Sequence, residues 1–337
     1  MTLDERLAPA PPTSTGPGAA AGEPDTGAAA PSDRRVGTLA GVAAYALWGV
    51  FPLVFHRLRD VAATEILMHR VLWSFVVVAL VLAVRRDTGW VGVLRHRRPD
   101  GARRRLALAA GCVSLNWLVY VWAVAHEHVI EAALGYYVNP LITVALGIVV
   151  LGERLRGPQV VALALGAASV AVLTVAYGRV PWIALVLACS FAGYGFLKKA
   201  VAVPATTSLA VETALASPIA LVGLLVLEVR GDAAFLHGSL GRDALLVGLG
   251  VVTAVPLVLF GIAARRIPLS LLGLLQYLTP TGQLLCGVLL LGEALPPERL
   301  AGFVLVWVAL MVLTADALRD GRRARRLAAA TEGQVGV

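Results

Sequence analysis

Three ionisable residues lie close together in an apolar stretch near the start of the chain: Glu65, His69 and Arg70. Arg70 lies about six residues, or ~9 Å of helix, inside that stretch, where a charge facing lipid would cost ~2.5 to 3.5 kcal/mol. We therefore expect its guanidinium to face the protein interior and to bind an anionic group or gate a pathway. The alternatives are a static ion pair with Glu65 or Glu131, or a side chain that snorkels to the membrane surface.

Two groups of titratable side chains could exchange protons. Glu65 and His69 are one helical turn apart and share a face. Glu131 follows a short segment that contains two histidines and Glu127. We interpret Glu65, His69 and Glu131 as candidates for proton coupling, because burial and a neighbouring charge can move a carboxyl pKa. The alternative for the second group is a solvated loop with a glutamate that suits a helix N-terminus.

Uncharged polar side chains recur inside the apolar stretches, in two places beside a proline that interrupts the backbone hydrogen bonds. Such groups often line a cavity, although they also form interhelical hydrogen bonds worth ~0.6 kcal/mol on average. We expect substrate contacts from Trp48, Asn116, Tyr120, Tyr136, Asn139, Gln276, Tyr277 and Gln283.

The composition places these residues in a membrane protein. The chain is 58% hydrophobic and only 15% charged over 337 residues, which is far too apolar for a soluble protein of this size. The net charge of +8 does not indicate nucleic-acid binding, because the basic residues lie at the ends of apolar runs. Three cysteines without a CxxC pattern favour neither disulfides nor a metal site, and no cofactor is expected.

The apolar runs predict an all-α polytopic protein with ten membrane-spanning helices. Lys and Arg gather in every second connection, which predicts that both termini are cytoplasmic. The predicted spans are 36–55, 64–84, 104–125, 132–151, 158–177, 181–198, 208–228, 243–264, 269–291 and 298–316.

The chain repeats itself at an offset of 140 residues. Tyr137, Pro140, Gly152 and Glu153 of the first half have counterparts at the corresponding positions of the second, among them Glu293. An odd number of spans in each half makes the two copies inverted, which is a signature of secondary transporters. We expect a disordered tail at 1–35, repeats at 36–177 and 178–316, and a basic tail at 317–337. A weaker match pairs Glu65 with Glu212.

Several motifs resemble one family. The Leu-Gly-Glu turns at 151–153 and 291–293, the Trp48 to Pro52 segment, and the run from Asn116 through Trp122, Glu131 and Tyr136 to Pro140 resemble the RarD-type members of the EamA family, within the drug/metabolite transporter superfamily. The resemblance covers about residues 36 to 316. It implies a ten-helix secondary carrier of the cell membrane with two EamA repeats.

We therefore expect a secondary-active transporter of a small metabolite or drug-like molecule, working by alternating access and driven by protons. The substrate is expected to be anionic because of Arg70. No G-x-x-x-x-G-K-[ST], H-E-x-x-H or G-x-S-x-G motif occurs, which disfavours an ATPase or an enzyme. A channel or a lipid-handling protein remains the alternative, and either a monomer or a homodimer fits.

Overall fold

The computed structural model describes residues 31–95, 101–151, 157–199, 201, 203–264, 266–267 and 269–335, and all regular elements in these ranges are helices. They are α1 (Pro31–Gly49), α2 (Phe51–His56), α3 (Ala63–Val84), α4 (Gly89–Arg95), α5 (Ala102–Ala125), α6 (Val129–Leu151), α7 (Gly157–Tyr177), α8 (Trp182–Lys199), α9 (Ala205–Arg230), α10 (Leu240–Ala264), α11 (Leu269–Leu275), α12 (Leu278–Leu285), the π-helix η1 (Cys286–Leu290) and α13 (Pro297–Val335). Within the described ranges, eight helical segments are long and apolar enough to cross a membrane.

Two of the ten predicted spans have no counterpart among these eight segments. The span predicted at 181–198 is α8, a shorter apolar helix. The span predicted at 269–291 is divided into α11, α12 and η1. Pro280 has no N–H to offer the carbonyl of Gln276, so the α-helical bonding is interrupted where α12 begins.

Both predicted tails overlap helices. α1 begins at Pro31, inside the tail predicted at 1–35, whose residues 1–30 lie outside the described ranges. The basic segment predicted as a tail at 317–337 continues α13 as far as Val335. The first Leu-Gly-Glu turn, with Gly152 and Glu153, lies outside the described residues.

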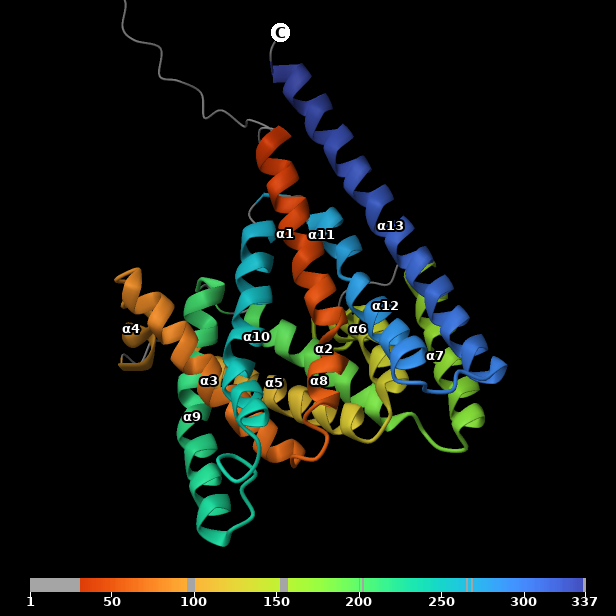
Figure 1. Ribbon diagram of the computed structural model, residues 1–337. Helices are drawn as coiled ribbons and strands as arrows, with labels where there is room; N and C mark the ends of the chain where they lie inside the picture. The colour runs from red at the N-terminus through yellow and green to blue at the C-terminus, as the bar shows by residue number, and fades with distance from the viewer. Residues whose placement is uncertain are drawn as a thin grey trace, which may run out of the picture.

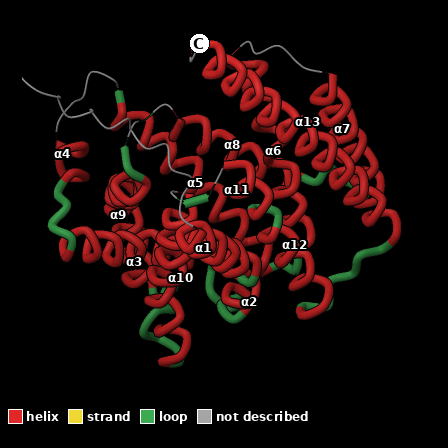
Figure 2. The backbone as a smooth tube through the Cα atoms, turned by 90° about the horizontal axis from the view of Figure 1, so that it is seen from above, coloured by secondary structure: helices red, strands yellow, loops and turns green. Residues whose placement is uncertain are grey.

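The helices form one bundle in which neighbours come from different parts of the chain. α7 and α13 lie side by side along one edge, and α3 and α9 lie toward the opposite edge (Figures 1 and 2). α1 contacts α10 and α12, and α6 contacts α8. We call the side on which α1 begins and α13 ends the terminal side, and the other the distal side; the connection between α9 and α10 is distal (Figure 1).

The contact between α1 and α12 is unusually close. A Cβ atom placed on Gly282 would lie 2.9 Å from the Cα atom of Gly49, so only glycine fits there. Three groups of α12 and η1 also donate hydrogen bonds to carbonyls of α1: Thr279 Oγ1 to Tyr45, Gln283 Nε2 to Trp48 and Cys286 Sγ to Gly49. Helices from the two halves are therefore bonded together along this contact.

Candidate functional site

Arg70 lies in the middle of the bundle, as its position in the sequence predicted, and is only 4% exposed. Its Nε donates a hydrogen bond to Thr253 Oγ1 of α10 at 3.1 Å. Its guanidinium carbon lies 4.0 Å from the centre of the Trp117 ring, and at 5.7 and 5.5 Å from the rings of Phe51 and Phe55. The cation is thus held by aromatic faces and one hydroxyl.

The ion pair of Arg70 with Glu65 or Glu131, considered above as an alternative, is not formed in the described structure. In the described part of the chain, no carboxylate lies within ion-pairing distance of Arg70, and its terminal nitrogens donate no hydrogen bond. A buried charge without a counter-ion costs several kcal/mol, at the order of magnitude seen in proteins. Cation–π contact returns about 2 kcal/mol when desolvated, so a large part of this cost is left.

Glu65 is instead bound by the chain between α9 and α10. The backbone N–H groups of Ala234 and Phe235 donate to its Oε1 at 2.9 and 3.0 Å. His69 shares this face as predicted, with Nε2 at 4.0 Å from Glu65 Oε1, and its Nδ1 accepts a hydrogen bond from Trp73. Glu65 therefore fastens a distal connection to α3.

Glu131 is also bound by a later part of the chain. Its carboxylate accepts hydrogen bonds from Arg179 Nη2 at 2.7 Å and from the backbone N–H of Ile183, in the first turn of α8, at 3.1 Å. It is 2% exposed. Of the two nearby histidines, His126 stacks on Trp122 with ring centres 4.2 Å apart.

The polar residues of α5 and α6 divide into bonded and unbonded groups. The amide nitrogen of Asn116 donates to Leu187 O and Ser190 Oγ of α8, and its oxygen accepts from the hydroxyl of Tyr136. This is the interhelical hydrogen bonding considered as an alternative. The hydroxyl of Tyr120, 5.8 Å from Tyr136 between ring centres, is buried without a partner in the described structure.

Of the residues predicted in the second half, Gln283 contacts α1. Trp48 packs edge-on against Tyr45, and Gln283 donates to the Trp48 carbonyl. The amide oxygens of Gln283 and Asn139 are buried without a partner among the described residues. Tyr277 packs in the same apolar cluster as Tyr137 and Leu284, whereas Gln276 lies in the turn before α12.

The structure identifies two carboxylates that the sequence analysis did not select. Glu293, in the second Leu-Gly-Glu turn, accepts hydrogen bonds from the backbone N–H groups of Val129 and Ile130 at the start of α6. Glu212 of α9 is buried against α8. The sequence did contain a signal for each: Glu293 belongs to the repeat, and Glu212 matches Glu65 in the weaker one.

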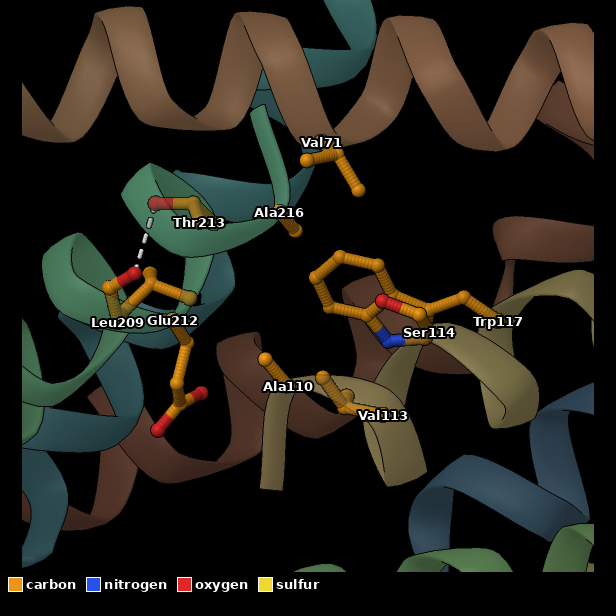
Figure 3. Close-up of a pocket in the computed structure, with 9 residues that line it drawn as sticks. All are labelled: Val71, Ala110, Val113, Ser114, Trp117, Leu209, Glu212, Thr213 and Ala216. Atoms are coloured by element: carbon orange, nitrogen blue, oxygen red, sulfur yellow. Dashed lines mark hydrogen bonds between the residues drawn. The ribbon is translucent and has the colours of Figure 1, made fainter. Parts of the chain in front are cut away.

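A pocket lies beside the arginine, with walls from α3, α5 and α9. Figure 3 shows the indole of Trp117 projecting into its centre, with Val71 on one side and Ala110 and Val113 on the other. The guanidinium of Arg70 lies over the ring of the same indole. Trp117 therefore stands between the pocket and the buried cation.

A bundle of apolar, membrane-length helices around a buried cation and a polar interior is the architecture of a polytopic membrane transporter. Residues 35–175 match the EamA-like transporter family. The chain is 50% identical over 303 residues to a RarD protein of Streptomyces exfoliatus, covering 89% of this chain and 95% of that protein. It is 43% identical over 296 residues to an uncharacterized transporter of Pseudomonas aeruginosa, covering 87% and 98%.

The chain therefore belongs to the RarD group of the EamA-like transporter family, and it is a transporter and not an enzyme. Its fold resembles that of a protein solved by crystallography, with a TM-score of 0.53 and 20% sequence identity, over 83% of this chain and 97% of the other.

Proposed function

We propose that this protein is a secondary carrier that moves a small organic anion across the cell membrane by alternating access, with both termini in the cytoplasm and a proton gradient as the drive. The observation that carries the proposal is Arg70, a buried cation without a carboxylate partner among the described residues. An anionic substrate group supplies the missing counter-charge. Functional roles are the default for ionisable residues inside a membrane.

The surroundings of Arg70 fit this role. Trp117 occupies one face of the guanidinium, which leaves the in-plane N–H groups for a planar anion such as a carboxylate. The buried hydroxyl of Tyr120 is a donor without a partner in the described structure, and it belongs to the same aromatic cluster as Phe55. An anion in this place would accept hydrogen bonds from both residues.

The sequence repeat supports alternating access. Two inverted copies give a carrier two conformations that are related to each other, one open to each side. The alternating Lys and Arg content of the connections supports the placement of both termini in the cytoplasm.

Thermal unfolding of the purified protein with a library of paired compounds tests the proposal. Each carboxylic acid is compared with its methyl ester, for the wild type, Arg70→Gln and the control Arg57→Gln, which removes an exposed arginine. We expect some acids, and not their esters, to stabilise the wild type and Arg57→Gln but not Arg70→Gln. Equal stabilisation by acids and esters, or retention of the effect in Arg70→Gln, would overturn the proposal.

The compounds found in this way then distinguish a carrier from the alternatives. In proteoliposomes a carrier gives saturable uptake that depends on the pH gradient. Uptake that rises linearly with concentration would indicate a channel, and stabilisation only by lipids would indicate a lipid-handling protein.

A further inference from the structure

Glu212 differs from the other buried carboxylates of the described structure in what binds it. Its Oε1 accepts a hydrogen bond from Ser208 Oγ at 2.6 Å, and its Oε2 accepts one from the hydroxyl of Tyr194 at 3.1 Å. Lys198 Nζ lies 3.2 Å from Oε1 and also donates to the Tyr194 hydroxyl at 2.8 Å. The glutamate is 2% exposed. All these partners are side chains.

The nature of the partners decides how easily they leave. Glu65 and Glu131 are each bound by backbone N–H groups, so releasing either of them requires the backbone to move. The partners of Glu212 can leave by rotating a side chain. Among these partners, Lys198 has the longest and most flexible side chain, and that side chain is 26% exposed.

Glu212 also lines the pocket that Trp117 separates from Arg70. The pocket is lined by Glu212, Thr213 and Ala216 of α9 on one side and by Ser114 and Trp117 of α5 on the other. Figure 3 shows the carboxylate of Glu212 extending away from Trp117. Lys198 lies near the C-terminal end of α8, and Glu212 lies near the start of α9.

We propose that Glu212 is the proton-binding site of the transport cycle, where a proton and the ammonium group of Lys198 compete for the same carboxylate. The proton site rests on the proposed function, a proton-driven carrier, and identifies the residue that couples protons to transport. A proton from water binds a carboxylate oxygen of Glu212 and breaks the ion pair. The Lys198 side chain then rotates so that its ammonium group is hydrated. Glu65, His69 and Glu131, the candidates from the sequence, are structural in this account.

The charged and titratable groups around Glu212 set the sign of the coupling. Lys198 and Tyr194 face it from α8. The residues of α3 and α5 that line the pocket include no titratable side chain, and Arg70 lies behind Trp117. The residues of α4 that pack in this region are Trp90 and Val93. An anion bound at Arg70 would make a proton on Glu212 more favourable, because two negative charges repel each other. The proton and the anion are therefore expected to bind together and to move in the same direction.

Infrared spectroscopy of the protein in proteoliposomes tests the proton site without any substrate. The band of a protonated carboxyl group is followed as the pH is lowered, in the wild type, in Glu212→Gln and in the control Glu65→Gln. We expect one titrating component of the wild type to be absent in Glu212→Gln and present in Glu65→Gln. A component that persists in Glu212→Gln would overturn the proposal.

A second variant keeps the test valid if Glu212→Gln does not fold. Lys198→Met retains the carboxylate and removes the cation that competes with the proton for it. The component assigned to Glu212 must then appear at higher pH than in the wild type, and an unchanged titration would contradict the proposal. If Glu212 titrates but no acid stabilises the protein, the proton site stands and the anion proposal is refuted. If an acid stabilises the protein but Glu212 does not titrate, the proton site alone is refuted.

Discussion

The backbone N–H of Val129 donates a 2.6 Å hydrogen bond to Oε1 of Glu293, 164 residues later in the chain. The N–H of Ile130 donates to the other carboxylate oxygen at 2.9 Å. The glutamate of the second Leu-Gly-Glu turn is thus the cap of α6, the helix that carries Tyr136 and Asn139. A negative charge is favourable at this end of a helix.

Removing this cap should destabilise the protein. Glu293→Ala leaves two N–H groups of α6 without an acceptor, and loss of a helix cap costs about 0.5 to 2 kcal/mol. Glu293→Gln keeps one acceptor oxygen and should cost less. Unfolding by denaturant in detergent measures both, and equal stability of the two variants would contradict the role of the hydrogen bonds.

The same glutamate should make stability depend on pH. Burial raises the pKa of Glu293 above its ordinary value, although the N–H groups of Ile130 and Val129 and the charge of His128 act in the opposite direction. The folded state therefore binds a proton more readily than the unfolded state, and stability falls as pH rises from the ordinary carboxyl pKa through the raised one. The stability of the wild type relative to Glu293→Gln should decline over this window in melting experiments. A difference that grows with pH would show the sign to be wrong.

The ion pair of Glu131 and Arg179 should respond unequally to the loss of its two members. Glu131 is 2% exposed and also accepts the N–H of Ile183, so Glu131→Ala leaves a buried donor unpaired at a cost of about 1 to 3 kcal/mol. Arg179→Ala should cost more, about 3 to 5 kcal/mol, because it leaves the buried carboxylate of Glu131 without its cation. Thermal unfolding of both variants compares the two costs, and equal losses would refute this asymmetry.

Trp117 and Arg70 should be coupled energetically. Replacing the indole by Leu removes the ring 4.0 Å from the guanidinium carbon, whereas Phe retains an aromatic face. We expect Trp117→Leu to destabilise more than Trp117→Phe, by up to about 2 kcal/mol from the lost cation–π contact. A double-mutant cycle with Arg70→Met measures the coupling, and additive effects would show that the two side chains do not interact.

The contact of α1 with α12 should not tolerate a methyl group. Gly282→Ala places a carbon 2.9 Å from the Cα atom of Gly49, and backbone cannot rotate away. Overpacking of this kind typically costs about 1 to 3 kcal/mol. The matched control is Gly195→Ala in α8, which has open space and should be neutral or slightly stabilising. Equal melting temperatures for the two variants would refute the close packing.

The sequence predicted the burial of Arg70 but not its partners. The depth of a residue within a span follows from counting along one helix, so the position of Arg70 in α3 was accessible. Thr253, by contrast, is 183 residues away, and its contact with Arg70 depends on how α3 and α10 are rotated against each other. When the residues around a membrane-spanning helix are apolar on every side, the sequence does not indicate which side faces its neighbour.

The same limit applies to the partners of the buried carboxylates. Arg70 was the cation considered for Glu65, whereas in the structure Glu65 accepts hydrogen bonds from backbone N–H groups in a distant connection. Backbone donors carry no signature in the side-chain sequence. Glu212 had a counterpart in the weaker repeat, but its contacts with Lys198 and Tyr194 could not be inferred without knowing how α9 and α8 are placed.

The hydrogen bonds from Thr279, Gln283 and Cys286 to the carbonyls of α1 constrain how a transport cycle can proceed. α1 lies in the first half of the sequence and α12 in the second, yet hydrogen bonds join them. α3 with α9 and α10, α6 with α8, and α7 with α13 also make contact across the two halves. A movement that separated the first half of the sequence from the second would have to break all of these contacts, so the moving parts of the proposed carrier would each contain helices from both halves.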